Sequence, residues 1–135
     1  MRKVIVAICL MLSGPAFAVG TSVPWSMGGR FPPFDAVVAQ YNQSSELFRI
    51  QGHCQSACTL FLSIRNVCVE PSATLLFHAG GRGEVSPAAT EHMLNAYNSG
   101  LRAYVTAHHY MDTLQFHAIS GRDIIHRFGY RQCPG

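Results

Sequence analysis

Two polar side chains of this 135-residue chain have the types and the setting needed for nucleophilic catalysis. Ser56 lies in the segment G-H-C-Q-S-A-C (52–58), directly before an apolar run, where its hydroxyl would meet the first free N–H groups of a buried helix. His78 directly follows a second apolar run, 74–77. A serine hydroxyl becomes a nucleophile when a base takes its proton, and histidine is the commonest base. The competing interpretation is an ordinary N-cap for Ser56 and a structural role for His78.

Two further features could contribute to a ligand site. The pair Gly28-Gly29 precedes the first predicted helix, and a backbone without side chains can turn sharply there and point N–H groups at a ligand. Arg82 lies in the glycine-rich segment 80–83, either as a solvated loop residue or as a group that binds a substrate carboxylate. His53 and Gln55 flank Ser56 and could contact a ligand, although loop polarity alone explains them.

The first 18 residues have the pattern of a secretory signal peptide. Arg2-Lys3 precede the apolar run 4–12, which is followed by S-G-P and by the cleavage-like A-F-A at 16–18. This run is too short to span a bilayer, and no later run of 18 apolar residues exists, so we expect the mature protein not to be membrane-embedded. We therefore expect an exported protein, periplasmic or secreted, with one domain over 19–135.

The charge of residues 19–135 excludes some classes of function. Of 10 basic residues, removal of Arg2 and Lys3 leaves 8 arginines against 7 acidic residues, and no lysine. The arginines are scattered without a basic stripe, so nucleic acid is not an expected partner. The absence of lysine excludes a Ser–Lys dyad. A hydrophobic fraction of 48% predicts a packed domain, and no cofactor is expected.

An even number of cysteines in an exported chain favours two disulfides. The four that follow residue 18 are Cys54, Cys58, Cys68 and Cys133. Three connectivities are possible, and the sequence does not choose among them; if 56–64 is a helix, the first two cysteines flank its start and are free to reach the later two. A zinc site that combines the first two cysteines with His53 or His78 is the alternative, but C-x3-C is not a strong zinc spacing, so no metal is expected.

Strands alternate with helices along the chain, which favours an α/β fold. We expect strands over 47–51, 67–70 and 74–77, and helices over 34–44, 56–64, 87–107 and from Ser120 to Gly129. Ser86-Pro87 supply good N-cap and N1 residues for the long helix 87–107. His108-His109 suit the end of that helix, and His117 is a weak candidate to support His78.

The order of these features resembles the ClpP/crotonase-like superfamily. The resemblance is carried by the glycine pair, a helix, a strand, G-x-x-x-S at the start of a buried helix, and a strand that ends in F-H. The run G-x-C-x-S-A-C-T-L, with the later V-C-V-x-P and F-H-A, is similar to small exported ClpP-like proteins whose activity is not established. The resemblance as a whole covers residues 26–133 loosely and residues 52–79 with some specificity.

This resemblance implies a truncated ββα superhelix, because only residues 19–27 precede the glycine pair. It also assigns roles by position: Ser56 as nucleophile, His78 as base, and the backbone N–H groups of Gly29 and Ala57 as oxyanion donors. Asp112 lies near the region where the family has the acid of its triad, whereas Asp123 is better explained as a capping partner of Ser120.

The leading expectation is therefore an exported serine hydrolase, a peptidase or an esterase, acting on an unknown peptide, ester or acyl ligand. The alternative is a catalytically silent binding or scaffold module of the cell envelope that keeps the pocket for a carboxylate or acyl group. A third interpretation, an interaction protein that uses the aromatic-proline segment 31–34, would be favoured by a buried Ser56. The sequence does not indicate the oligomeric state.

Overall fold

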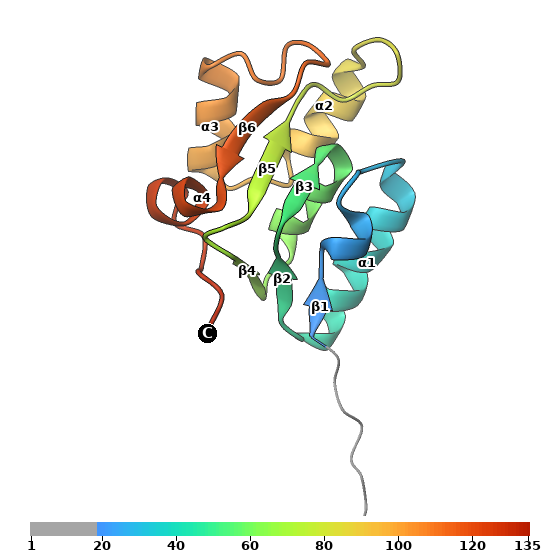
Figure 1. Cartoon of the computed structure of the whole chain (residues 1–135). Coiled ribbons are helices and arrows are strands. Elements are labelled where there is room, and N and C mark those ends of the chain that lie inside the picture. Colours follow the sequence, from blue (N-terminus) through green and yellow to red (C-terminus); the bar gives the residue numbers. More distant parts are fainter. Residues whose placement is uncertain (1–18) are drawn as a thin grey trace, which may run out of the picture.

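The computed structural model describes residues 19–135, and the predicted signal segment 1–18 lies outside the described residues. Strands and helices alternate along the chain (Figure 1). The strands are β1 (Gly20–Thr21), β2 (Phe48–Ile50), β3 (His53–Gln55), β4 (Val67–Val69), β5 (Thr74–Phe77) and β6 (His117–Ser120). The α-helices are α1 (Phe31–Ser44), α2 (Pro87–Leu94), α3 (Ser99–Ala107) and α4 (Gly121–Phe128), and the 3-10 helices are η1 (Val23–Trp25) and η2 (Ser56–Ser63).

Two three-stranded sheets form the framework of the domain. One sheet has the order β1-β2-β4 with all strands parallel, and the other has the order β3-β5-β6 with β6 antiparallel to β5. The consecutive strands β2 and β3 belong to different sheets and are followed by η2; β4 and β5 likewise belong to different sheets and are followed by α2. The protein is thus a small single-domain α/β protein with helices and mixed sheets, which confirms the prediction of an α/β fold class.

The helix η2 forms the centre of the core. Residues 57–62 are all buried, which agrees with the prediction of a buried helix over 56–64, although the helix is 3-10 rather than α. Phe61 packs against Phe34 of α1, with ring centroids 5.4 Å apart, and against Phe48 of β2, at 4.6 Å. Such aromatic contacts bury large apolar areas and fix the distance between the helix layer and the sheet.

Three predicted helix ends are confirmed. The Ser86 side chain accepts a hydrogen bond from the Ala89 amide at the start of α2 (3.2 Å), and Ser120 accepts one from Asp123 at the start of α4 (3.1 Å). Gly129 ends α4 in the left-handed conformation. The first helix begins at Phe31 rather than at residue 34, because proline is tolerated in the first helical turn.

The prediction of one long helix over 87–107 is wrong. The chain forms α2 and α3 instead, and the Asn98 side chain caps α3 by accepting a hydrogen bond from the Leu101 amide (3.0 Å). The buried Tyr97 fixes the turn between the two helices, because its hydroxyl lies 2.7 Å from that of Thr59 in η2. A side-chain cap competes with continued helix, so the hydrophobic periodicity alone did not reveal this break.

The structure also answers the question of disulfide connectivity. Cys54 is bonded to Cys58, and Cys68 to Cys133, so the first two cysteines do not reach the later two. All four are buried. Two disulfides are consistent with an exported protein. Within residues 19–135 no helix has the length and apolar character that crossing a membrane requires.

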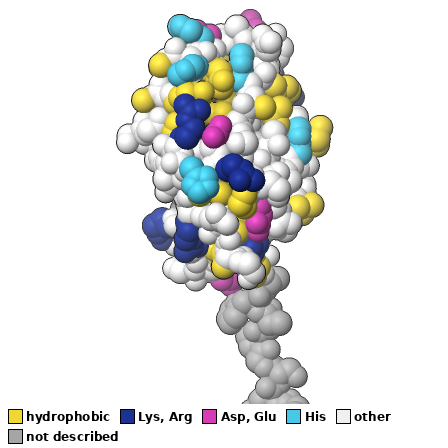
Figure 2. Space-filling view, turned by 60° about the vertical axis from the view of Figure 1, so that its left-hand side comes forward, with side chains coloured by type: hydrophobic (Ala, Val, Ile, Leu, Met, Phe, Trp, Pro, Cys, Tyr) yellow, Lys and Arg dark blue, Asp and Glu magenta, His cyan; other side chains and the backbone are white. Residues whose placement is uncertain are grey.

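The outer surface of the domain is mixed in character. On the face shown in Figure 2, arginine, histidine and acidic side chains are dispersed among apolar ones rather than gathered into one stripe. Some charges on the surface of the domain are paired: Arg127 contacts Asp123 within α4, and Arg102 of α3 contacts Glu91 of α2. Exposed pairs of this kind contribute little to stability, so the core and the disulfides carry most of it.

We expect the two disulfides to contribute unequally to stability. Loop closure predicts that the double substitution Cys68→Ala/Cys133→Ala lowers the free energy of unfolding by about 4 kcal/mol. For Cys54→Ala/Cys58→Ala the predicted loss is about 2 kcal/mol, because this disulfide closes a much shorter loop. The sequence separations are 65 and 4 residues. Urea unfolding of the three proteins measures both losses. An equal or larger loss for the Cys54/Cys58 pair would contradict the chain-entropy explanation.

Candidate functional site

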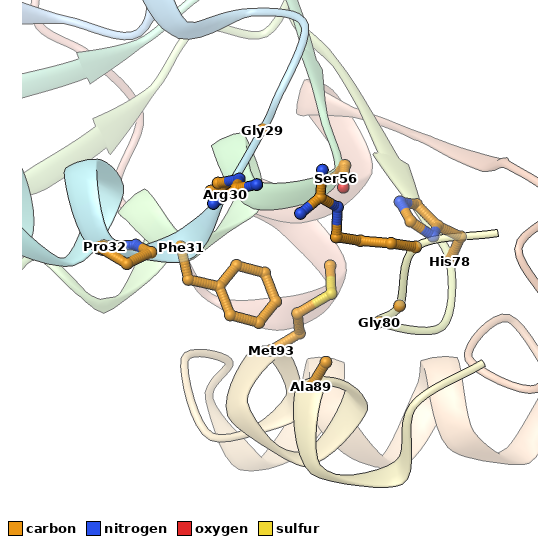
Figure 3. Close-up of a pocket in the computed structure, with 11 residues that line it drawn as sticks. Gly29, Arg30, Phe31, Pro32, Ser56, His78, Gly80, Ala89 and Met93 are labelled. Carbon is orange, nitrogen blue, oxygen red and sulfur yellow. The ribbon is translucent and has the colours of Figure 1, made fainter. Parts of the chain in front are cut away.

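A pocket of about 550 Å³ lies between the start of α1, the start of η2 and the helix α2 (Figure 3). Ser56, His78 and Gly29, which the sequence analysis selected separately, all line this pocket. They come from three different parts of the chain: the β3–η2 junction, the end of β5 and the loop before α1. The fold therefore brings the predicted nucleophile, base and one oxyanion residue to a single cavity.

Ser56 lies where strand β3 turns abruptly into η2. Its φ is 56°, in the left-handed region that non-glycine residues rarely adopt. Ser56 is the first residue of η2 and Gln55 takes the N-cap position, so the N-cap interpretation of Ser56 does not describe this junction. The residue is partly exposed, which removes the condition under which the interaction-protein interpretation would be favoured. Strain at a sharp turn is typical of functional residues.

The loop that carries the glycine pair lies directly against Ser56. A Cβ atom on Gly28, whose φ is 72°, would lie 2.9 Å from the Cβ of Ser56 and 2.8 Å from the carbonyl oxygen of Gln55. The Gln55 backbone N–H donates to Ser26 O (2.9 Å), and its side-chain Nε2 donates to Met27 O (3.0 Å). Only glycine permits this approach, and two hydrogen bonds from Gln55 hold it in place.

Two backbone N–H groups are free to serve this site. The Gly29 amide has no hydrogen-bond partner among residues 19–135. Ala57 is the second residue of η2, where a backbone N–H has no acceptor within the helix. The amide nitrogen of Ala57 would lie 3.3 Å from a Cβ on Gly28, so the two chain segments meet beside Ser56. Preorganised amides of this kind can stabilise a negatively charged oxygen.

His78 is almost completely enclosed, with 8% of its surface exposed. Burial lowers the pKa of His78 from its ordinary value of 6.5, and the nearby backbone of Ala79 opposes this lowering in part. The Phe116 ring meets the imidazole edge-on, with centroids 4.9 Å apart. The imidazole is therefore neutral at pH 7, which is the form that can accept a proton.

No acid orients this histidine in the part of the chain that the structure describes. The Nδ1 atom of His78 is buried without a hydrogen-bond partner there. Asp112 is exposed and accepts a hydrogen bond from Nδ1 of His109 (2.8 Å), although Thr113 next to it accepts one from the amide of Ala79 (2.8 Å). The backbone next to Asp112 therefore lies close to the site, but the Asp112 carboxylate pairs with His109 and not with His78.

Of the other candidate side chains, Arg82 lines the pocket, whereas His53, Gln55 and His117 lie outside it. The His117 ring stacks on Tyr110 with centroids 4.4 Å apart, and Nε2 of His53 lies 2.7 Å from the amide oxygen of Gln55. The disulfide between Cys54 and Cys58 leaves neither sulfur as a free thiolate for zinc. Within residues 19–135 no group of three or more histidine, cysteine or acidic residues could hold a metal ion.

Two pocket residues were missed by sequence reasoning or given another role. Arg30 directly follows the glycine pair and lines the pocket together with Arg82. Met93 was assigned to the core from helical periodicity; it is buried, but it also forms part of the pocket wall. The position of Arg30 next to the glycine pair was a signal that could have identified it. Nothing in the helical pattern distinguishes Met93 from its core neighbours.

Comparison with known proteins does not add to this description. No family model matches the chain, and no curated protein matches it either. The function must therefore be inferred from the geometry of the pocket and from the residues themselves.

We expect His78 to make the protein less stable in acid. The unfolded chain protonates this imidazole near its ordinary pKa of 6.5, whereas the folded protein resists protonation because the ring is buried. The contribution of neutral His78 to the free energy of unfolding is therefore fully present above the pKa of this residue in the unfolded chain. It is lost as the pH falls from that value towards the lower pKa of His78 in the folded protein. Substitution His78→Asn should flatten the dependence of unfolding free energy on pH between about 7.5 and 5, measured by urea unfolding.

The matched control for this measurement is His126→Asn, which changes an exposed histidine of α4. Its pH dependence should remain that of the unsubstituted protein. If His78→Asn and His126→Asn gave the same slope, the neutral buried state of His78 would be refuted.

Proposed function

We propose that this protein is an exported serine hydrolase, a peptidase or an esterase, in which Ser56 is the nucleophile and His78 the base. The observation that carries the proposal is one pocket lined by a partly exposed serine in a strained backbone conformation, a buried neutral histidine and Gly29 with its free amide, while the amide of Ala57 lies directly behind Ser56. These are the parts that acyl transfer needs: a nucleophile, a proton acceptor and donors for the developing oxyanion.

The chemistry would proceed in two halves. The Ser56 oxygen attacks the substrate carbonyl carbon while His78 takes the hydroxyl proton, and the carbonyl oxygen becomes an oxyanion held by the amides of Gly29 and Ala57. Collapse breaks the bond to the leaving group, which receives the proton from His78. Water then attacks the acyl-serine while His78 accepts a proton from it. Collapse breaks the bond to the Ser56 oxygen, which receives that proton from His78, and the acid is released.

The arrangement of the strands supports the resemblance to the ClpP/crotonase-like superfamily. Each of the pairs β2/β3 and β4/β5 gives one strand to each sheet and is followed by a helix, which is the repeat that a ββα superhelix would show. The serine begins the helix after the first pair, and the histidine ends the second pair. A truncated fold of this superfamily is accordingly part of the proposal.

Export is the second part of the proposal. Oxidised cysteines persist in the periplasm and outside the cell, where glutathione does not reduce them. Both disulfides of the domain join cysteines that follow the predicted signal segment, and they support secretion or a periplasmic location.

One observation favours a different function, a silent binding or scaffold module of the cell envelope. The Nδ1 atom of His78 has no partner within residues 19–135, and Asp112 is bonded to His109. Removal of the acid from a serine–histidine–aspartate triad lowers turnover by about 10⁴-fold, so an unoriented histidine fits ligand binding better than rapid catalysis. The same pocket would then bind an acyl or carboxylate ligand without cleaving it.

Reaction with a fluorophosphonate distinguishes the two functions. The full chain, secreted into an oxidising compartment so that both disulfides form, should incorporate one phosphonyl group, measured by intact mass. Ser56→Ala should abolish labelling, and His78→Ala should slow it by at least about 100-fold, because the base contributes that much to activation of the hydroxyl.

Ser63→Ala and His126→Ala serve as matched controls. Ser63 lies in the same helix as Ser56, with its hydroxyl bonded to the Leu60 carbonyl, and neither control residue lines the pocket. Both controls should label at the rate of the unsubstituted protein. Folded protein that remains unlabelled, or that labels equally in Ser56→Ala, would refute the hydrolase proposal; absence of labelling would favour the binding module.

A further inference from the structure

The pocket carries positive charge that the chain itself does not neutralise. Arg30 and Arg82 both line it, and no acidic residue does. Neither arginine forms an ion pair or a side-chain hydrogen bond within residues 19–135. Three other arginines are paired with carboxylates: Arg49, Arg102 and Arg127. What distinguishes Arg30 and Arg82 is that two guanidinium groups without a carboxylate partner lie at one cavity.

The position of Arg82 is defined by a small hairpin rather than by a free loop. Gly81 and Val85 form an isolated antiparallel bridge, and the Ser86 amide donates to Gly80 O (2.7 Å). The Gly80 amide in turn donates to the Thr90 hydroxyl of α2 (2.9 Å). Because the base of the hairpin is bonded to α2, the backbone of Arg82 is held beside the pocket, and its exposed side chain forms part of the lining.

Arg30 is held at the opposite edge by the first turn of α1. It is the N-cap residue of that helix, in an extended conformation, and it directly follows Gly29. Figure 3 shows Arg30 at the edge of the pocket near Ser56. Arg30 and Arg82 thus come from two separate segments, the loop before α1 and the hairpin before α2, and both flank the site of the proposed attack.

The rest of the pocket wall is apolar. In Figure 3 the side chains of Phe31 and Met93 lie together on the same side of Ser56 and His78. The Phe31 ring is fixed by stacking on His92 of α2, with centroids 4.7 Å apart, and His92 is bonded to Asp35 of α1 (3.0 Å). This surface would accept an aliphatic or aromatic group and exclude water from it.

The nearby acidic side chains do not cancel the charge of the two arginines. Asp35 is bonded to His92 and does not line the pocket. Glu84 belongs to the same hairpin as Arg82, but it is exposed and also lies outside the pocket lining. The cavity therefore combines two cationic groups with an apolar wall, which complements a ligand that has an anionic end and an apolar segment.

From this arrangement we infer that the pocket selects acyl substrates that bear a carboxylate, which Arg30 and Arg82 bind while Phe31 and Met93 contact the apolar segment. The carboxylate is the chemistry that a half-ester of a dicarboxylic acid and the free C-terminus of a short peptide share. This inference rests on the proposed function for the position of the scissile carbonyl, beside Ser56. The arginine pair itself needs no catalysis in order to bind an anion.

Binding is measured with the full chain carrying Ser56→Ala, so that no ligand is consumed. Calorimetry compares octanoate with octanamide, and acetyl-dileucine with its C-terminal amide, at low salt. At least one carboxylate should bind at least about tenfold more tightly than its neutral partner, because charge-assisted hydrogen bonds to two arginines are lost in the amide. The pair with the larger ratio shows whether the pocket prefers a carboxylate on an alkyl chain or one at the end of a peptide.

Arginine substitutions show whether these two residues cause the selectivity. Arg30→Gln and Arg82→Gln should each weaken binding of the preferred carboxylate by about tenfold and change binding of its amide by less than about twofold. Arg122→Gln is the matched control, since Arg122 is exposed in α4 and lies outside the pocket, and it should change neither. Equal binding of acid and amide, absence of binding, or the same effect from Arg122→Gln would overturn the inference.

A kinetic comparison separates this inference from the hydrolase proposal. The unsubstituted protein is given 4-nitrophenyl hydrogen glutarate and 4-nitrophenyl pentanoate, which have acyl chains of equal length, and release of nitrophenolate is followed. A higher kcat/KM for the charged ester that falls in Arg30→Gln and Arg82→Gln supports both proposals. Hydrolysis that depends on Ser56 but is as fast for the neutral ester overturns the inference alone. Selective binding of carboxylates without any hydrolysis overturns the hydrolase and leaves a carboxylate-binding pocket.

Discussion

The backbone conformation at Ser56 is the constraint on which the site depends. A left-handed serine between a strand and a helix costs on the order of 1–3 kcal/mol, and it persists only when its surroundings hold it. Here the disulfide between Cys54 and Cys58 spans the turn, and Gln55 is hydrogen-bonded to the loop before Gly28. The same bonds that hold the serine bring the glycine loop against it, so one local constraint positions both the proposed nucleophile and the amides beside it.

The second requirement of the proposed site is a dry environment for His78, the proposed base. His78 directly follows β5, between the buried residues Phe77 and Ala79, and its own burial keeps the imidazole neutral near pH 7. The enclosure has a cost, because Nδ1 has no hydrogen-bond partner within the described residues. A histidine in this condition can accept a proton, but nothing fixes its ring orientation except packing against side chains such as Phe116. The balance between catalysis and mere binding depends on that single missing contact.

Much of the local structure could be predicted from the sequence because it depends on local chemistry. The caps at Ser86 and Ser120 are bonds between residues three apart, and the sequence shows them directly. The strands β3 and β6 were missed, since β3 is short and polar and β6 has one buried residue, Ile119. Both strands are held by hydrogen bonds to β5. A local sequence pattern does not show which strands will be neighbours in a sheet, so it could not predict these two. The break after α2 likewise depends on the contact of Tyr97 with η2.

The sequence by itself determined the class of fold at the coarse level, the presence of a buried helix after Ser56, and the residues with the chemistry for acyl transfer. These follow from residue types and spacing, which act over short distances along the chain. Only the tertiary structure decided the disulfide connectivity, the convergence of Ser56 with His78 on one pocket, and the addition of Arg30 and Met93 to its wall. It also decided that Asp112 pairs with His109, because the direction of a side chain depends on contacts between segments that are distant in the sequence.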